Sequence, residues 1–185
     1  ELVLGSLPLS HRKEFVAVAI GAQHATKQLP FIRLIELCDK INKPKVLLGG
    51  KEDAAMGRKV EDFFRKTQKS ASKEEGLLEL NKKAIIFNGC GKYNLNQSAY
   101  LVKKSKCLFI HDTGLMHIGA AFKKQIFSIW GNTVPSFGMY PYRTKFTIFE
   151  NNKIDCRPCS KIGFDKCPKG HFKCMNESIF DFYLP

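Results

Sequence analysis

Short apolar runs alternate along the chain with longer segments whose apolar residues recur at helical spacing. Five runs of β-forming residues are predicted to be strands, with a sixth candidate after them: residues 15–20, 45–48, 84–87, 107–111, 125–130 and 145–149. The clearest helical stripe between them is Phe31, Leu34, Ile35, Cys38 and Ile41. Strands that alternate with helices in this way predict an α/β fold, a doubly wound parallel sheet with helices on both faces.

Loops that contain glycine or proline follow most of these strands, at residues 21–29, 49–50, 89–93, 112–114 and 131–135. Because the carboxyl ends of parallel strands meet at one edge of the sheet, these loops are expected to converge there, where open α/β sheets bind ligands. The first strand is not followed by a Gly-x-Gly-x-x-Gly motif, and the sequence has no Walker lysine motif. Both findings argue against a dinucleotide site and a P-loop.

The stretch 107–122 joins an apolar run to a helical pattern through Asp112, Thr113 and Gly114. A sharp turn there would bring a helix N-terminus to the end of a strand, and its free N–H groups and dipole favour an anion such as phosphate. Gly114 would let a ligand approach the backbone, and His117 lies on the same side of the helix. The alternatives are a simple Asp-Thr helix cap and a structural histidine. An aspartic protease is disfavoured, because it needs two facing carboxylates and the triplet occurs once.

Basic residues outnumber acidic ones, 30 to 17, and give the 185-residue chain a formal net charge of +13. This excess favours an anionic partner, which could be nucleic acid, an acidic membrane surface or a phosphorylated ligand. The lack of an Arg-rich block and of an RNP-like aromatic motif argues against nucleic acid. An apolar content of 44% is typical of a globular protein. Neither a membrane-spanning run nor a signal-peptide pattern is present, so we expect a cytoplasmic protein.

Four of the seven cysteines gather near the end of the chain with a histidine: Cys156, Cys159, Cys167, His171 and Cys174. Four thiols and an imidazole this close together suggest a structural zinc site, although the spacing fits neither a zinc knuckle nor a zinc finger. Disulfides and free thiols are the alternatives. The segment is also basic, so it could lie on an anionic membrane surface or near a phosphorylated acceptor.

The chain is expected to divide at two points. Residues 1–14 look polar and irregular, and we expect a linker or docking segment there. Residues 15–155 would form the α/β domain. Residues 156–185 would form the Cys-rich basic tail, with a C-terminal helix packed on the domain. The charged stretch 68–82 has no clear pattern.

An ordered set of motifs runs through the sequence. They are Ile20-Gly21-Ala22 and Lys27-x-x-Pro30, then Leu47-Leu48-Gly49-Gly50-x-Glu52, then Asp112-Thr113-Gly114-x-x-His117-x-x-Ala120-Ala121, and finally Trp130-Gly131-x-Thr133-x-Pro135. Together they resemble glycosyltransferase family 9, the ADP-heptose:lipopolysaccharide heptosyltransferases and their relatives, over residues 15–180. The resemblance implies a GT-B enzyme of two Rossmann-like domains facing a cleft, and it is to the C-terminal, nucleotide-sugar-binding half.

The resemblance also implies roles for individual residues. The donor-binding motif is matched by Asp112, Thr113, Gly114 and His117. Lys27 is expected to neutralise the diphosphate or the departing nucleotide, which makes it the catalytic candidate. Glu52 is expected to hold the ribose hydroxyls, and Tyr93 lies near the position that packs on the base. Gln23 replaces the hydroxyl residues that are common in heptosyltransferases, which leaves the identity of the sugar open.

The expected function is transfer of a heptose or related sugar from a nucleoside-diphosphate donor of the ADP-heptose type to lipopolysaccharide or another envelope glycan, with inversion. No metal is expected to be required for catalysis, because GT-B enzymes usually need none and no Asp-x-Asp motif occurs. The acceptor site and an aspartate base would belong to the N-terminal half of the same enzyme, so this chain alone is expected to be inactive. The enzyme would work in the cytoplasm, at the inner membrane. The alternative is a basic, zinc-stapled nucleic-acid-binding module.

Overall fold

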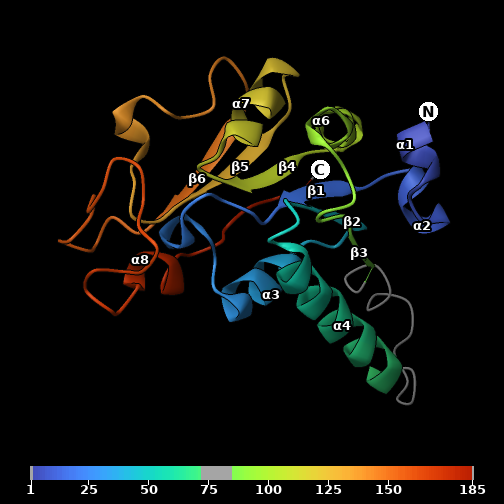
Figure 1. The fold of residues 1–185 in the computed structure, drawn as a ribbon, viewed down its shortest axis with the longest axis horizontal. Helices are drawn as coiled ribbons and strands as arrows, with labels where there is room; N and C mark the ends of the chain where they lie inside the picture. The colour runs from blue at the N-terminus through green and yellow to red at the C-terminus, as the bar shows by residue number, and fades with distance from the viewer. Residues whose placement is uncertain (1, 72–84, 185) are drawn as a thin grey trace.

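The computed structural model describes residues 2–71 and 85–184 of the chain. In this part of the chain six parallel strands form one sheet in the order β3-β2-β1-β4-β5-β6 (Figure 1). The strands are β1 Val16–Ala19, β2 Lys45–Leu48, β3 Ile86–Asn88, β4 Leu108–His111, β5 Ile126–Trp130 and β6 Phe146–Glu150. All six predicted strands are therefore confirmed, and the second agrees at both ends.

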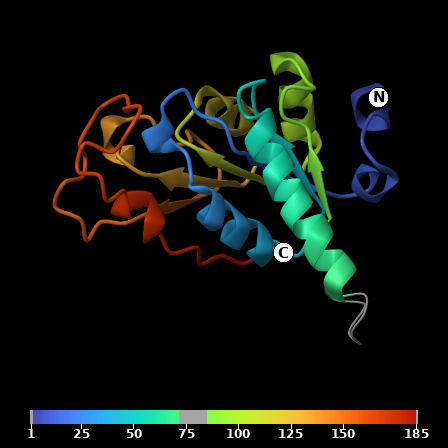
Figure 2. The same cartoon turned by 60° about the horizontal axis from the view of Figure 1, so that its bottom comes forward.

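Helices cover both faces of this sheet. On one face lie α3 (Phe31–Lys40) and α4 (Ala54–Ala71), and on the other lie α6 (Leu95–Lys104) and α7 (Gly114–Ala121), as Figures 1 and 2 show. The predicted stripe of α3 faces inward, because the side chains of Leu34 and Cys38 are buried. The doubly wound α/β fold, Rossmann-like in its strand order, is confirmed.

The four inner strands β1, β2, β4 and β5 are buried on both faces, which is why their sequences read as nearly continuous apolar runs rather than alternating ones. Val16 and Val18 belong to the core under α3 and α4, whereas Ala17 and Ala19 belong to the core under α6 and α7. Each helical layer therefore packs on its own apolar core on one face of the sheet.

The N-terminal segment departs from the irregular conformation expected of it. It forms two single-turn helices, α1 (Leu2–Gly5) and α2 (Leu9–Arg12). Leu7 between them is 1% exposed, and the His11 ring Nε2 lies 3.1 Å from the carbonyl oxygen of Lys45. Helices of one turn are too short for a 3.6-residue apolar period, so periodicity could not reveal them. The segment contacts the sheet and is part of the fold.

The tail forms the short helix α8 (Lys173–Asn176) and then runs extended beneath the sheet, past α3 (Figure 2). Rings of β4, β5 and β6 stack beside one another there, with Phe109 and Phe127 4.4 Å apart between centroids. Phe182 packs against both rings, and Lys40 Nζ donates to the Phe180 carbonyl oxygen at 2.9 Å. The extended segment thus covers a face that a helix would otherwise cover.

Residues 72–84, most of the charged stretch without a pattern, lie outside the described residues, and residues 68–71 belong to α4. Within the described residues, no helix combines the length and apolar character needed to cross a membrane. The division of the chain at residues 14 and 155 stays a prediction.

Candidate functional site

A pocket of about 720 Å³ opens at the carboxyl ends of β1, β2 and β4. It lies where the strand order reverses, because the chain continues from β1 to β2 on one side and β4 pairs with β1 on the other. Such a switch point is where doubly wound sheets bind ligands. All eight residues singled out from the sequence line this one pocket: Gln23, Lys27, Glu52, Tyr93, Asp112, Thr113, Gly114 and His117.

Lys27 and Asp112 form an ion pair in this pocket. Lys27 ends the single 3-10 turn η1 (Ala25–Lys27) of the β1 loop, and its Nζ lies 2.7 Å from Asp112 Oδ2. The Thr133 hydroxyl, on the loop after β5, donates to the same carboxylate oxygen at 3.0 Å. Asp112 therefore joins the loops after β1, β4 and β5, and it orients the Lys27 ammonium at the end of β4.

The N-terminus of α7 faces the pocket without a side-chain cap. Thr113 occupies the N-cap position in an extended conformation, and its hydroxyl makes no capping hydrogen bond. A Cβ built on Gly114 would have no neighbouring atom within 4 Å, so the space in front of the first turn is open. His117, one turn into the helix, is exposed and also lines the pocket. The site thus presents the positive end of a helix dipole to a hollow large enough for a ligand.

Asp53, just before α4, lies on the opposite wall and was missed by the sequence reasoning. Its carboxylate is 7% exposed and its Oδ2 accepts the Gly50 N–H at 2.8 Å. Burial raises the pKa of Asp53, and the charge of Glu52 acts in the same direction. A Cβ on either Gly21 or Gly49 would collide with this carboxylate. The sequence offered a single indication of this residue, an acid shortly after the Gly49-Gly50 pair. Glu52 matched that indication equally well, so the sequence could not distinguish the two acids.

The remaining predicted residues form the rim of the pocket. Gln23 and Glu52 are exposed, and the Glu52 carboxylate lies against Gly50. Tyr93 is half-buried, and its hydroxyl lies 2.8 Å from Ser6 Oγ on the N-terminal segment. The first residues of the chain therefore hold one of the pocket's side chains.

His111, the last residue of β4, fastens the β1 loop beneath the pocket. It is 1% exposed, and its Nε2 accepts the N–H of Leu29 at 3.1 Å. Burial lowers the pKa of His111 to about 4, against a smaller opposing effect of the Gly21 carbonyl. The imidazole is consequently neutral at pH 7. It holds the β1 loop by accepting a hydrogen bond and does not act as a cation.

The Arg157 guanidinium connects the tail to the pocket. It donates to the carbonyl oxygens of Gly131 and Thr133 and pairs with Glu150 at 2.7 Å, and its side chain is 3% exposed. Thr133 in turn holds Asp112. This chain of contacts places the tail behind the pocket and positions the loop that orders the ion pair.

The candidate metal ligands of the tail lie near one another. Cys156 Sγ is 3.8 Å from His171 Nε2, and both line a second hollow of about 900 Å³ beside β6. Burial raises the pKa of Cys159, and it raises that of Cys174 to about 11; the nearby Cys167 sulfur adds to both shifts. Among the described residues, no three His, Cys, Asp or Glu side chains have a geometry that could hold a metal ion. The zinc site remains a prediction.

The arrangement suits stabilisation of negative charge. The Lys27 ammonium and the uncapped first turn of α7 reach one hollow from two directions. A leaving diphosphate develops charge that such groups stabilise without reorganising. The exposed carboxylate of Glu52, on the other wall, can accept hydrogen bonds from ligand hydroxyls.

The model of a known family, described as glycosyltransferase family 9 (heptosyltransferase), matches residues 8–167. The chain is 31% identical over 101 residues to lipooligosaccharide heptosyltransferase 2 of Haemophilus influenzae, a match that covers 50% of this chain and 29% of that protein. Its fold is similar to that of E. coli ADP-heptose LPS heptosyltransferase II, with a TM-score of 0.66 and 20% identity, over 95% of this chain and 49% of that one.

A second solved structure, E. coli heptosyltransferase WaaC with ADP, is similar with a TM-score of 0.56 and 18% identity, over 79% of this chain and 41% of that one. The chain therefore spans less than half of each of these three relatives.

Proposed function

Because the chain belongs to glycosyltransferase family 9, we propose that its pocket binds the nucleoside diphosphate of a sugar donor. The enzyme would transfer a heptose or related sugar, with inversion, to lipopolysaccharide or another envelope glycan. The observation that carries the proposal is the meeting of Lys27 with an uncapped helix N-terminus and the open space at Gly114. That combination is what a diphosphate requires.

The diphosphate would lie against the first turn of α7, where the N–H groups and the dipole favour an anion. Lys27 would then share its ammonium between Asp112 and a phosphate oxygen. Asp112 itself carries a negative charge, so its role is to order the turn and to hold Lys27 rather than to bind phosphate. The charge that develops on the departing nucleoside diphosphate is stabilised by groups already in place.

The other end of the donor would lie toward β2. Glu52 would accept hydrogen bonds from the ribose hydroxyls, and Tyr93 would pack on the base. The buried Asp53 would shape this wall. ADP is the first nucleotide to test, because the similar WaaC structure contains it.

Acceptor binding and the catalytic base would belong to a second domain, since this chain spans 49% of heptosyltransferase II. The 185-residue chain would then bind a donor without transferring its sugar. Sugar transfer by the purified chain would contradict this. The enzyme would act on the cytoplasmic side of the inner membrane, associated with its anionic surface. Neither a metal nor nucleic acid would take part.

Calorimetric titration with ADP, UDP and GDP tests the proposal. At least one of them is expected to bind wild type, and Lys27→Ala should lose about 1.5–3 kcal/mol, roughly tenfold or more in affinity. Lys153→Ala, which removes an exposed lysine outside the pocket, is the matched control and should bind normally. If wild type ignores all three nucleotides but binds an oligonucleotide in a strongly salt-dependent manner, the nucleic-acid alternative is correct instead.

A further inference from the structure

The distribution of charge along the chain is uneven. Residues 85–149 contain a single acidic residue, Asp112, and that residue is buried and paired with Lys27. Most of the basic residues of this stretch lie at the end of α6, just after α6 and α7, and in the loop between β5 and β6. This stretch therefore carries eight basic residues against one acidic residue, +7 of the formal net charge of +13.

That layer is the α6–α7 face, defined by the exposed cations Lys103, Lys104, Lys123, Arg143 and Lys145. Helices α6 and α7 pack side by side on the same side of the sheet (Figure 1). Within residues 2–71 and 85–184, none of these five cations forms an ion pair with a carboxylate. Their charges are available to an external anion.

Aromatic side chains are interleaved with these cations. Lys104 Nζ lies 5.6 Å from the centre of the Tyr100 ring. Lys103 Nζ lies at the same distance, 5.6 Å, from the Phe122 ring. Arg143 Cζ is 5.1 Å from Tyr142, whose ring is 59% exposed.

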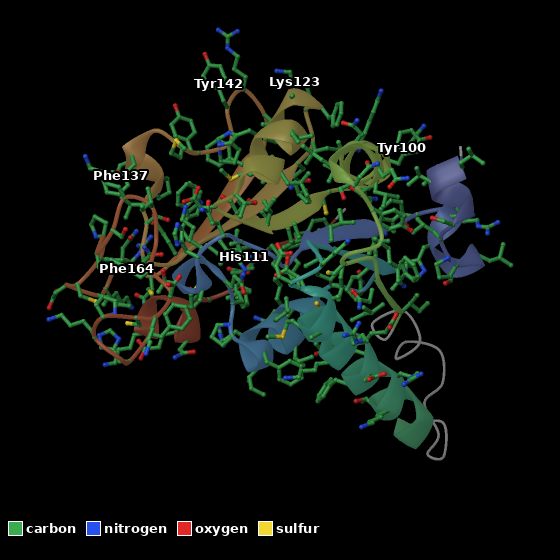
Figure 3. The ribbon with its side chains drawn as sticks, viewed as in Figure 1. Tyr100, His111, Lys123, Phe137, Tyr142 and Phe164 are labelled. Atoms are coloured by element: carbon green, nitrogen blue, oxygen red, sulfur yellow. The ribbon has the colours of Figure 1, made fainter. Side chains whose placement is uncertain are left out.

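The loop that carries Tyr142 is fastened to the same surface. Lys123 Nζ, at the end of α7, donates to the Arg143 carbonyl oxygen at 2.9 Å. Figure 3 shows Tyr142, Lys123 and Tyr100 following one another along the upper edge of the molecule. The cations and the rings therefore belong to one continuous surface that spans two helices and a loop.

We propose that the α6–α7 face docks on an anionic lipid surface. Lysine and arginine stems can bury apolar carbons while their charges reach lipid phosphates. Tyrosine rings favour the boundary between headgroups and acyl chains. Acidic side chains would oppose such contact, and this face has none exposed. The inference rests on the proposed function in one respect: it identifies the surface through which the proposed membrane association would occur.

The position of the pocket supports the same orientation. The loop that carries Tyr142 also carries Met139, which is 52% exposed and lines the pocket. One loop thus joins the docking surface to the pocket mouth. Docking through this face would hold the mouth close to the bilayer, within reach of an acceptor anchored there.

The tail is the competing basic surface. Its cations are accompanied by Asp165, Glu177 and Asp181, which dilute their charge. Most of the tail, with α8, lies at the lower left in the view of Figure 1, away from α6 and α7. The two surfaces can therefore be tested against each other with equal changes of charge.

The experiment is co-sedimentation with vesicles of phosphatidylcholine containing phosphatidylglycerol. The face variant combines Lys103→Gln, Lys104→Gln, Arg143→Gln and Lys145→Gln. The matched variant, called the tail variant, combines Lys153→Gln just before the tail with Lys166→Gln, Lys169→Gln and Lys173→Gln within it. All eight side chains are exposed, so both variants should fold, which circular dichroism checks.

Wild type and the tail variant should bind the anionic vesicles, more weakly as salt is raised, and neither should bind pure phosphatidylcholine. The face variant should lose at least roughly tenfold in partition coefficient, since each basic residue at the surface contributes to binding. Equal loss in both variants would mean that only net charge matters and would overturn the proposal. So would an oligonucleotide that binds the face and displaces vesicles from it.

ADP titration of the same proteins separates this proposal from the proposed function. The face variant should bind ADP as wild type does, because none of its four positions lines the pocket. Vesicle binding without any nucleotide binding would refute the donor site and leave the docking face standing.

Discussion

The two walls of the pocket use glycine for opposite purposes. On the β2 wall, a Cβ on Gly49 would lie 2.7 Å from Asp53 Oδ2 and 2.8 Å from Asp53 Cβ. On the β4 wall, a Cβ on Gly114 would meet nothing within 4 Å. The first glycine is required by the protein's own packing, whereas the second leaves room that the protein does not fill.

The difference separates residues that shape the fold from residues that make room for a ligand. Neither glycine has a positive φ, so backbone conformation does not explain either one. The β2 wall encloses a carboxylate whose pKa is raised by burial. The β4 wall holds its carboxylate in an ion pair at 2.7 Å. Packing thus dominates on one side and charge on the other, and His111 binds the loop after β1, the strand between β2 and β4.

Acidification should weaken the contact between His111 and the β1 loop, and this is the largest expected effect. The pKa of His111 is about 4 in the fold and about 6.5 in an unfolded chain, so the unfolded state binds the proton first. The stability due to the neutral imidazole is present above pH 6.5 and is lost as pH falls toward 4, by about 3 kcal/mol. Burial lowers the pKa of His11 and acts in the same direction, while Asp53, whose pKa is raised, opposes both.

Urea unfolding at intervals between pH 7 and pH 4.5 measures this loss. His111→Asn should be less stable at pH 7 and should lose less stability on acidification than wild type. His117→Gln, which removes an exposed histidine, should retain the full dependence on pH. An equally steep loss in His111→Asn would show that another group is responsible.

Matched alanine substitutions sharpen the contrast between the walls. Gly49→Ala forces a methyl group into Asp53 and should cost about 2 kcal/mol of unfolding free energy. Gly114→Ala adds the same methyl group in open space at a helical position and should gain about 0.5 kcal/mol by restricting the unfolded chain. Urea denaturation of both variants gives the two signs, and equal signs would contradict the distinction.

A larger side chain at the open position should affect the ligand rather than the fold. Gly114→Val would occupy the space in front of the first turn of α7, and ADP affinity should fall by roughly tenfold, about 1.4 kcal/mol. Its thermal melting temperature should remain close to that of wild type. Calorimetry in parallel with thermal melting checks both statements; unchanged affinity would place the diphosphate elsewhere.

The smallest expected effect is at the Thr133 hydroxyl. Thr133→Val keeps the shape but removes the hydrogen bond to Asp112, and it should cost about 1 kcal/mol of stability. Thr133→Ser, which keeps the hydroxyl, should restore most of the loss. Urea denaturation of the two variants decides whether the hydroxyl or the packing of the methyl group matters.

Much of the fold could be predicted from local patterns, and the pocket residues from one local pattern together with the family resemblance. Apolar runs mark strands that are buried on both faces, as at residues 45–48. The loops after parallel strands lie at one edge of the sheet. The residues on these loops are therefore expected at that edge for any strand order. Asp112 could be placed at this edge from its own strand-turn-helix pattern, whereas Lys27 was assigned through the resemblance to the family.

Individual contacts were beyond prediction because they depend on which strands are neighbours. The Lys27–Asp112 pair requires β1 beside β4, and its hydrogen bond from Thr133 requires β5 beside β4. The position of Asp53 depends on the close approach of the loops that carry Gly21 and Gly49. The two N-terminal helices are too short to show a period, although Leu7 between them is buried.

The aromatic segment at the end of the tail has a consequence for how the protein is made. Phe180 and Phe182 cover rings on β4, β5 and β6, which leave the ribosome well before them. During synthesis these rings stay uncovered until residues 180–182 emerge, so this part of the core closes later than the part under α3 and α4. Contacts of such long sequence separation also slow folding. The nascent sheet is therefore open to aggregation through this face for longer than its opposite face.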